Sequence, residues 1–203
     1  MTAPRRPATG SQARAERTRG AVIDETVRCI LQEGFAPPSV RHITERAGLT
    51  WGVVQYHFGD LDGLLMAVVD KGFGELTAAL SDVGTAVAPD DLRTRTEFVI
   101  DTAWRAFSSP TSMAALEILI STRAARDTAA NTHLADIMRA LTQLGRGLGE
   151  GLAAPHATAI GNLIWATLRG LVVAQLVSPR PLDSAAERRV LVDVLVAYIG
   201  PRN

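Results

Sequence analysis

The segment from Trp51 to Tyr56 combines an amide, two aromatic rings and small aliphatic groups within six residues. An amide such as that of Gln55 can form paired hydrogen bonds with adenine, and an apolar side chain can contact the methyl group of thymine. At helical spacing, the outward-facing positions of the segment would be Trp51, Gly52, Val53, Gln55 and Tyr56. This chemistry suits the edges of DNA bases, provided that a helix presents the segment to solvent.

Two short helices must position these side chains, one over about residues 40–46 and one over about residues 51–56. Each follows a hydroxyl side chain, a residue type favoured at the start of a helix. Between them, Ala47-Gly48-Leu49 predicts a tight turn, because glycine adopts left-handed backbone angles without strain. Such a pair is typical of a helix-turn-helix, whose second helix enters the DNA major groove. For the turn alone, an ordinary helical hairpin within a core is the alternative.

The whole chain is predicted to be an all-α protein of about nine helices. It has 203 residues, of which 47% are apolar, and 21 basic residues balance 21 acidic ones. Apolar residues recur every three or four positions from Val22 to Leu31 and from Leu61 to Leu80. No segment alternates for long enough to indicate a sheet. Further helices are expected over residues 91–107, 110–125, 131–152, 155–177 and 183–199.

Three features of the sequence bear on the cellular compartment: the N-terminus, the single cysteine and the longest apolar run. Residues 1–12 are rich in Pro, Thr, Gly, Ser and Arg, which predicts a mobile arm without the apolar core of a signal peptide. Cys29 has no second cysteine for a disulfide, and we expect it to be a small buried core residue. Polar residues interrupt the run from Ile160 to Val177, which favours a buried helix over a membrane span. These features predict a cytoplasmic protein with no membrane partner.

The first third of the chain carries several further motifs in order. They are Gly34-Phe35, Ser39-Val40-x-x-Ile43, Ala47-Gly48-Leu49-Thr50-x-Gly52, Tyr56-His57-Phe58 and Leu64-Leu65. As a set, over about residues 17–70, they resemble the DNA-binding domain of TetR-family transcriptional regulators. The resemblance implies a homodimer with a three-helix operator-binding domain and a larger domain that binds a small ligand. We therefore expect an arm (1–12), a helix-turn-helix DNA-binding domain (13–60) and a ligand-binding and dimerisation domain (61–203).

The resemblance also implies which residues contact DNA. Val40 and Arg41 would lie near phosphates or base edges, and Thr50 would hydrogen-bond a phosphate. The remaining implied contacts are Trp51, Gly52, Val53 and Gln55 in the groove, with Tyr56 and His57 beside the DNA backbone.

Two positions depart from the family pattern. Gln55 stands where a tyrosine is usual, and Leu61 stands where a phosphate-binding lysine is usual. Because each phosphate contact contributes to affinity, we expect the arginines at positions 14, 17 and 19, together with Arg41, to carry more of the binding.

The C-terminal half suggests a ligand cavity rather than a reaction centre. Large apolar residues recur on consecutive predicted helices, with a few polar residues among them. The candidate ligand-binding residues are Trp104, Phe107, Met113, Leu116, Glu117, Met138, Leu141, Asn162, Trp165 and Arg169, with Asn131 and Gln143 as further polar candidates. An ordinary core is the alternative for the aromatic and methionine residues of this set.

The last two predicted helices carry apolar residues on nearly all sides, which is more than one buried face requires. The resemblance implies dimerisation through these helices. A four-helix bundle across a twofold axis would bury their second face. The candidate interface residues are Leu168, Leu171, Val172, Leu191, Val194 and Leu195.

The function that we expect is that of a ligand-responsive repressor. It would bind a near-palindromic double-stranded operator as a homodimer and be released by a small apolar or amphipathic effector. Gln55 and Leu61 motivate a second hypothesis, a TetR-like fold with weak or lost DNA binding that sequesters a ligand or binds proteins. The third, a small all-α enzyme, lacks a catalytic motif, and neither a cofactor nor a metal is expected from the residue spacing.

Overall fold

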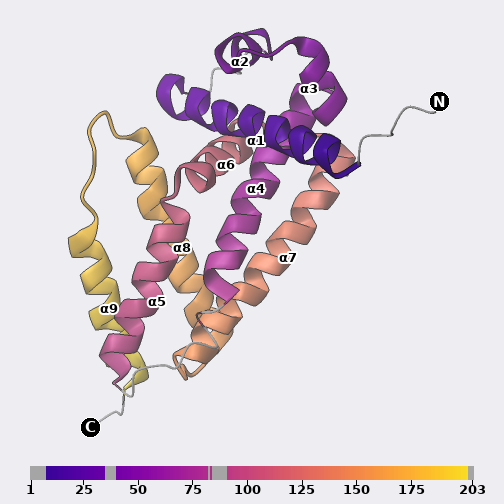
Figure 1. Ribbon diagram of the computed structural model, residues 1–203. Coiled ribbons are helices and arrows are strands. Elements are labelled where there is room, and N and C mark those ends of the chain that lie inside the picture. The colour runs from indigo at the N-terminus through magenta and orange to yellow at the C-terminus, as the bar shows by residue number, and fades with distance from the viewer. Residues whose placement is uncertain (1–7, 35–39, 82, 84–90, 201–203) are drawn as a thin grey trace, which may run out of the picture.

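Figure 1 shows the computed structural model of the protein. The structure describes residues 8–34, 40–81, 83 and 91–200. Within these ranges every regular element is a helix, as the sequence predicts. The helices are α1 (Ala8–Glu33), α2 (Val40–Ala47), α3 (Trp51–Phe58), α4 (Leu61–Ser81), α5 (Leu92–Phe107), α6 (Pro110–Ser121), α7 (Thr128–Gly151), α8 (Ala157–Val177) and α9 (Ala185–Ile199).

Helices α1, α2 and α3 form one end of the molecule together with the start of α4 (Figure 1). Gly48 follows α2 with a φ of 63°, the left-handed conformation that this tight turn requires. The backbone N–H of Leu49 closes the turn by donating to the carbonyl oxygen of Thr44 at 2.9 Å. After α3, the carboxylate of Asp60 caps α4 by accepting from the backbone N–H of Gly63 at 2.8 Å. These local contacts produce the predicted helix-turn-helix.

The apolar core beneath the helix-turn-helix extends into the rest of the protein. Its fully buried members include Val22, Ile30, Ile43, Val54 and Leu64. Ala114 and Ile118 of α6 and Leu134 and Ile137 of α7 belong to the same cluster. The helix-turn-helix end is therefore continuous with the rest of the fold.

A second apolar core lies among α5, α7, α8 and α9. Its buried residues include Leu148, Leu152, Ile160, Ile164, Leu168 and Leu195. Helix α4 contributes to both cores, with Leu64 and Val68 in the first and Leu76 and Leu80 in the second. The predicted domain boundary at residues 60 and 61 therefore coincides with the start of a helix that both cores share.

Glycines set an unusually close approach between α7 and α8. A Cβ atom at Gly161 would lie 1.7 Å from the carbonyl oxygen of Gly145, and one at Gly149 would lie 2.0 Å from that of Ala157. Neither position has room for a side chain, so this contact determines how α8 is rotated. By length and composition α8 is the one helix in the described part of the chain that could cross a membrane. Its buried residues Ile164 and Leu168 belong to the second core.

Four details of the prediction need correction. Helix α1 begins at Ala8, because good helix formers such as Ala13 and Arg14 extend it, so the predicted arm is too long. Residues 1–7 lie outside the described residues. The helix expected to reach residue 125 ends at Ser121, and the last helix begins at Ala185 rather than Asp183. Thr50 occupies the N-cap position of α3 without a side-chain capping hydrogen bond.

Candidate nucleic-acid interface and ligand cavity

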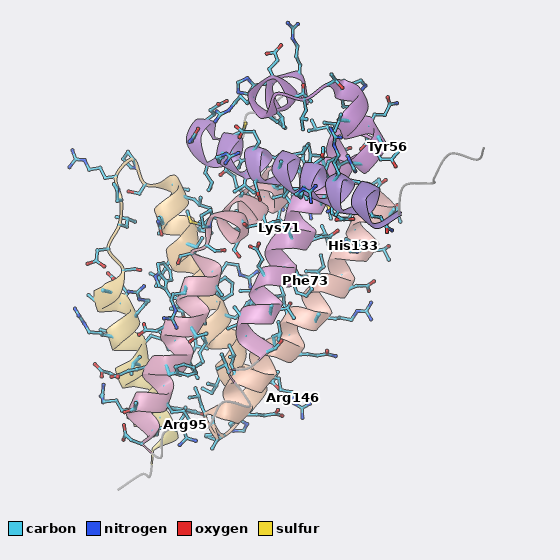
Figure 2. The ribbon with its side chains drawn as sticks, viewed as in Figure 1. Tyr56, Lys71, Phe73, Arg95, His133 and Arg146 are labelled. Atoms are coloured by element: carbon cyan, nitrogen blue, oxygen red, sulfur yellow. The ribbon has the colours of Figure 1, made fainter. Side chains whose placement is uncertain are left out.

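Helix α3 presents most of the predicted base-reading positions to solvent. Trp51 is 44% exposed and Tyr56 is 81% exposed, and Gly52 and Gln55 are exposed as well. Val54 is buried on the opposite face and anchors the helix to the core. Figure 2 places Tyr56 at the outer edge of this end of the molecule. The helix therefore offers one accessible face with amide and aromatic groups.

The remaining predicted DNA contacts differ in exposure. Thr50 is exposed, whereas Val53 and His57 are half-buried. The side chain of Val40 lies outside the described residues. Leu61 packs against the core, so an aliphatic group occupies the start of α4 where the family usually has lysine.

Arginines from two other helices lie at this end of the protein. Arg41 of α2 is exposed, and its Nε lies 2.8 Å from Oε1 of Glu45. Arg14 and Arg17 are exposed about one turn apart on α1. The guanidinium carbon of Arg19 instead lies 5.2 Å from the centre of the Phe58 ring, a cation–π contact that ties α1 to α3. Arg14 and Arg17 are therefore better placed than Arg19 to meet phosphates.

A buried carboxylate holds α2 against α1. Glu25 is 7% exposed, and it accepts hydrogen bonds from Nε of Arg46 and Nε of Arg28, each at 2.8 Å. Burial alone would raise the pKa of Glu25, but the two arginine hydrogen bonds lower it below the ordinary value. Arg46 also donates to Glu33 at 2.5 Å and to Gln32 at 2.9 Å. The ionised form of Glu25 thus stabilises the helix-turn-helix.

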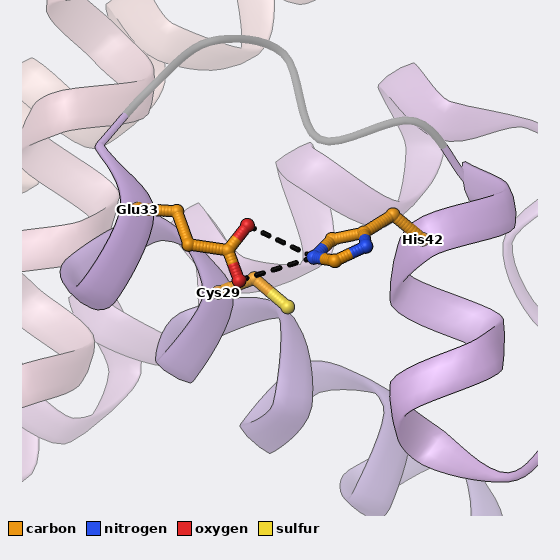
Figure 3. A group of neighbouring side chains, drawn as sticks. All are labelled: Cys29, Glu33 and His42. Atoms are coloured by element: carbon orange, nitrogen blue, oxygen red, sulfur yellow. Dashed lines mark hydrogen bonds and ion pairs between the residues drawn. The ribbon is translucent and has the colours of Figure 1, made fainter.

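Beside this ion pair, the structure brings together three side chains that the sequence reasoning did not connect (Figure 3). Cys29 is buried, as predicted, and burial raises the pKa of its thiol. Glu33 lies one turn further along α1, and a hydrogen bond from His42 of α2 lowers the pKa of Glu33. One donor atom of each of the three lies within 4.8 Å of the other two. The four-residue spacing of Cys29 and Glu33 was the only signal in the sequence, since His42 joins them only through the fold.

A mainly apolar cavity of about 80 Å³ lies among α4, the end of α5, α6, α7 and α8. Phe107 and Trp165 meet in its wall with ring centres 4.5 Å apart and planes inclined by 74°. The polar side chains that line it are Ser112 and Arg169. The Ser112 hydroxyl is buried and has no hydrogen-bond partner among the described residues. Six of the predicted ligand-binding residues line this cavity: Phe107, Leu116, Met138, Leu141, Trp165 and Arg169.

The other four predicted ligand-binding residues do not line the cavity. Trp104 lies under the guanidinium group of Arg188, with 4.6 Å from the guanidinium carbon to the ring centre. Met113 packs on the second core, and Asn162 lines a separate surface hollow with Arg146. Glu117 is likewise absent from the lining, as are the further candidates Asn131 and Gln143. Sequence reasoning identified much of the apolar wall and Arg169, but it missed Ser112 and included polar residues that lie elsewhere.

Most of the predicted dimer-interface residues are already buried within the single chain. Leu168, Val172, Leu191 and Leu195 are buried in the core of the single chain, because these sides of α8 and α9 face inward. Leu171 is partly buried, and of the six only Val194 is exposed. The apolar side chains that α8 and α9 leave exposed are Leu163, Val177, Val190, Val194 and Tyr198, a set we call the α8–α9 face.

Comparison with solved structures identifies the fold. The crystal structure of a TetR-family transcriptional regulator from Pectobacterium atrosepticum matches with a TM-score of 0.61 at 20% identity, covering 94% of this chain and 98% of that one. The chain therefore has the fold of the TetR-family regulators, with a helix-turn-helix at its N-terminal end.

Sequence comparison adds particular relatives. The HTH-type transcriptional regulator BetI of Burkholderia mallei is 25% identical over 186 residues, which cover 91% of this chain and 94% of that protein. A regulator of the same name from Burkholderia thailandensis is 34% identical over 82 residues, which cover 40% of this chain and 42% of that protein. No family model matches the chain. These similarities confirm the predicted resemblance to TetR-family regulators and support DNA-binding transcription regulation as the function.

Proposed function

We propose that the chain is a cytoplasmic, ligand-responsive transcriptional repressor and not an enzyme. It binds a near-palindromic DNA site as a homodimer and is released by a small apolar or amphipathic effector. The observation that carries the proposal is the exposed face of α3, on which Trp51, Gln55 and Tyr56 lie together while Val54 holds the helix to the core. An amide and apolar groups on a major-groove helix are suited to reading adenine and thymine.

Phosphate contacts would come mainly from arginines. Arg14 and Arg17 project from α1, and Arg41 projects from α2. Arg41 must exchange its carboxylate partner Glu45 for a phosphate when DNA binds. Since Leu61 is part of the core, the start of α4 supplies no cation at this position.

The homodimer would form through the α8–α9 face. A monomer exposing several large apolar side chains on α8 and α9 is unfavourable in water, and a second copy would cover them. Val177 is 77% exposed, Val190 59% and Val194 53%, so substantial apolar area remains to be buried. To bind two half-sites, such a dimer must hold its two α3 helices at the spacing of successive major grooves, about 34–36 Å.

The cavity beside Phe107 and Trp165 is the candidate effector site. At about 80 Å³ it is smaller than typical ligand pockets of about 300–1,000 Å³, so effector binding must push its walls apart. Met138 can adapt readily because its side chain is unbranched and flexible. An effector with an apolar body and one polar group would satisfy the buried Ser112 hydroxyl or pair with Arg169.

Helix α4 connects the cavity to the DNA-binding end. Val69, Gly72 and Phe73 line the cavity, while Leu64 packs beneath α3 (Figure 2 labels Phe73). A Cβ added at Gly72 would lie 3.0 Å from the Cβ of Ala115, so α4 and α6 are in close contact here. An effector that separates these helices would tilt α4 and move the helix-turn-helix away from DNA.

Gel-shift assays on duplexes that tile the intergenic DNA flanking the gene test the proposal. We expect one duplex to bind as a dimer with nanomolar affinity, and Gln55→Ala to weaken it. Thr132→Ala, an exposed change on α7, is the matched control. If no genomic duplex and no member of a random duplex library is retained above non-specific affinity, the chain is not a sequence-specific regulator, and the ligand-sequestering alternative replaces this proposal.

A further inference from the structure

We propose that Cys29, Glu33 and His42 form a binding site for a borderline-soft divalent metal ion, with Zn²⁺ as the best match, that links α1 to α2. The three side chains present a thiol sulfur, a carboxylate oxygen and an imidazole nitrogen, all within 4.8 Å of one another (Figure 3). Sulfur, nitrogen and oxygen donors together are the ligand types that zinc uses in proteins. Mg²⁺ and Ca²⁺ prefer sites made only of oxygen.

A tetrahedral zinc ion requires only small movements of the three side chains. Zinc–ligand distances of about 2.0–2.3 Å with tetrahedral angles place ligand atoms about 3.4–3.6 Å apart. Cys29 and Glu33 are four residues apart on α1, so they lie on the same side of that helix. Nε2 of His42 already faces Glu33, at 2.9 Å from Oε2. An ion would take the place of the proton between these two atoms, with the sulfur of Cys29 as the third ligand and water as the fourth.

Arg46 does not prevent binding, because Glu33 has two oxygen atoms. Oε1 of Glu33 accepts from Arg46 at 2.5 Å, and Nε2 of His42 lies close to both oxygens, at 3.0 Å from Oε1 and 2.9 Å from Oε2. The ion can bind Oε2 and leave the arginine contact in place, where it would orient the carboxylate as outer partners of metal ligands do. If Oε1 is also needed, Arg46 keeps Glu25 at 2.8 Å and Gln32 at 2.9 Å.

Charge and access also fit a divalent ion. Binding would release the thiol proton of Cys29 to solvent. The thiolate, together with the Glu33 carboxylate that Arg46 also contacts, would then present negative charge to the ion. The side chains of Glu33 and His42 are 43% and 42% exposed, whereas Cys29 lies beneath them at 1%. An ion can therefore enter from solvent between the carboxylate and the imidazole and reach the sulfur last.

Such an ion would connect two helices that flank the segment of residues 35–39. Helix α2 is the first helix of the helix-turn-helix, and the Arg46–Glu25 pair already joins it to α1. A bound metal would add a further link that is absent from the unfolded chain, so its binding free energy would stabilise this end of the protein.

Titration of the chelator-treated, tag-free full chain with CoCl₂ tests the site. We expect one equivalent of Co²⁺ to bind, with a near-ultraviolet charge-transfer band that reports a thiolate–cobalt bond and visible bands typical of tetrahedral cobalt. ZnCl₂ should displace the cobalt and raise the midpoint of thermal unfolding. Cys29→Ala should abolish the charge-transfer band. His42→Gln and Glu33→Gln, which change exposed side chains, should weaken Zn²⁺ binding by more than about tenfold.

His133→Gln is the matched control, because this histidine pairs with Asp70 at 2.6 Å, away from the site. It should leave cobalt and zinc binding unchanged. A wild-type chain without the charge-transfer band, or a band that persists in Cys29→Ala, would overturn the proposal. Equal Zn²⁺ affinity in the wild type, His42→Gln and Glu33→Gln would assign the binding to other carboxylates and overturn it as well.

Discussion

The helix-turn-helix end and the α8–α9 face both expose large side chains, but the groups around them differ. Around Trp51 and Tyr56 lie the arginines of α1 and α2, so the apolar groups are interspersed with positive charge. Beside the exposed Val190 and Val194 of the α8–α9 face lie exposed charges of both signs, Arg189 and Asp193, rather than a set of arginines. The first combination suits a polyanion that is read by its base edges, and the second suits a second copy of the chain. The chemistry surrounding exposed apolar groups therefore distinguishes the two kinds of partner.

The largest expected effect is a loss of folding when a charge is placed on the buried side of α9. Leu195 is buried in the second core, whereas its neighbour Val194 is 53% exposed. Leu195→Asp would bury an unpaired charge at a cost of several kcal/mol, so we expect the C-terminal half to unfold. Circular dichroism and thermal denaturation would measure this. A folded Leu195→Asp dimer would mean that α9 is rotated differently from the structure described above.

Val194→Asp should leave the fold intact and break the dimer. The charge would face water in the monomer but would be buried between two copies in the α8–α9 face. Loss of the linked second binding event should lower affinity for a full operator by about 10²–10⁴-fold. Sedimentation velocity and a gel shift on the same sample measure both effects. Val190→Asp should behave alike, and Thr132→Asp on the exposed side of α7 is the control. A dimeric, fully active Val194→Asp variant would place the interface elsewhere.

The contrast between Leu195 and Val194 also shows which parts of the structure the sequence could predict. Helix α3 was predictable because Gly48 and the apolar residues Ile43 and Val54 lie close together in the chain and determine which side of α3 is exposed. Helices α8 and α9 are apolar on nearly all sides, so periodicity alone does not say which side is buried. Their orientation depends on the glycine contact between Gly145 and Gly161 and on packing against α5. Periodicity likewise does not predict the cavity or the cluster of Cys29, Glu33 and His42, because the fold brings these residues together from different helices.

At the DNA-binding end, the buried ion pair predicts a pH-dependent stability. Because the folded-state pKa of Glu25 is lowered, its contribution is fully present above the ordinary glutamate value of 4.5 and is lost as the pH falls through the lower folded value. Glu25→Gln should therefore destabilise the protein by about 1–3 kcal/mol at neutral pH, and the difference from wild type should shrink below pH 4.5. Urea denaturation across this range measures it. A difference that is constant down to acid pH would contradict the assignment.

Two substitutions at the helix-turn-helix end should distinguish base recognition from phosphate binding. Gln55→Ala should cost about 1–3 kcal/mol on the operator and relax the preference at one base pair, if the amide makes a paired contact. Arg41→Ala should instead weaken all duplexes alike. Competition gel shifts with single-base operator variants measure both. If Gln55→Ala retains its base preference, Trp51 and Val53 carry the reading.

The smallest expected effect concerns the arginines of α1. Arg14 and Arg17 face solvent on this helix, while Arg19 lies on the ring of Phe58. Each phosphate contact adds about 0.9 to the slope of log affinity against log salt concentration, so Arg14→Gln and Arg17→Gln should each reduce the slope by about that amount. Arg19→Gln should reduce the slope less and lower thermal stability, because it removes a cation–π contact between α1 and α3. DNA-binding isotherms at several salt concentrations measure these slopes. All variants keep the α8–α9 face unaltered, so the oligomeric state stays the same. Equal slopes in the wild type and in the Arg14 and Arg17 variants would exclude α1 from the phosphate contacts and leave Arg41 as the main cation of the interface.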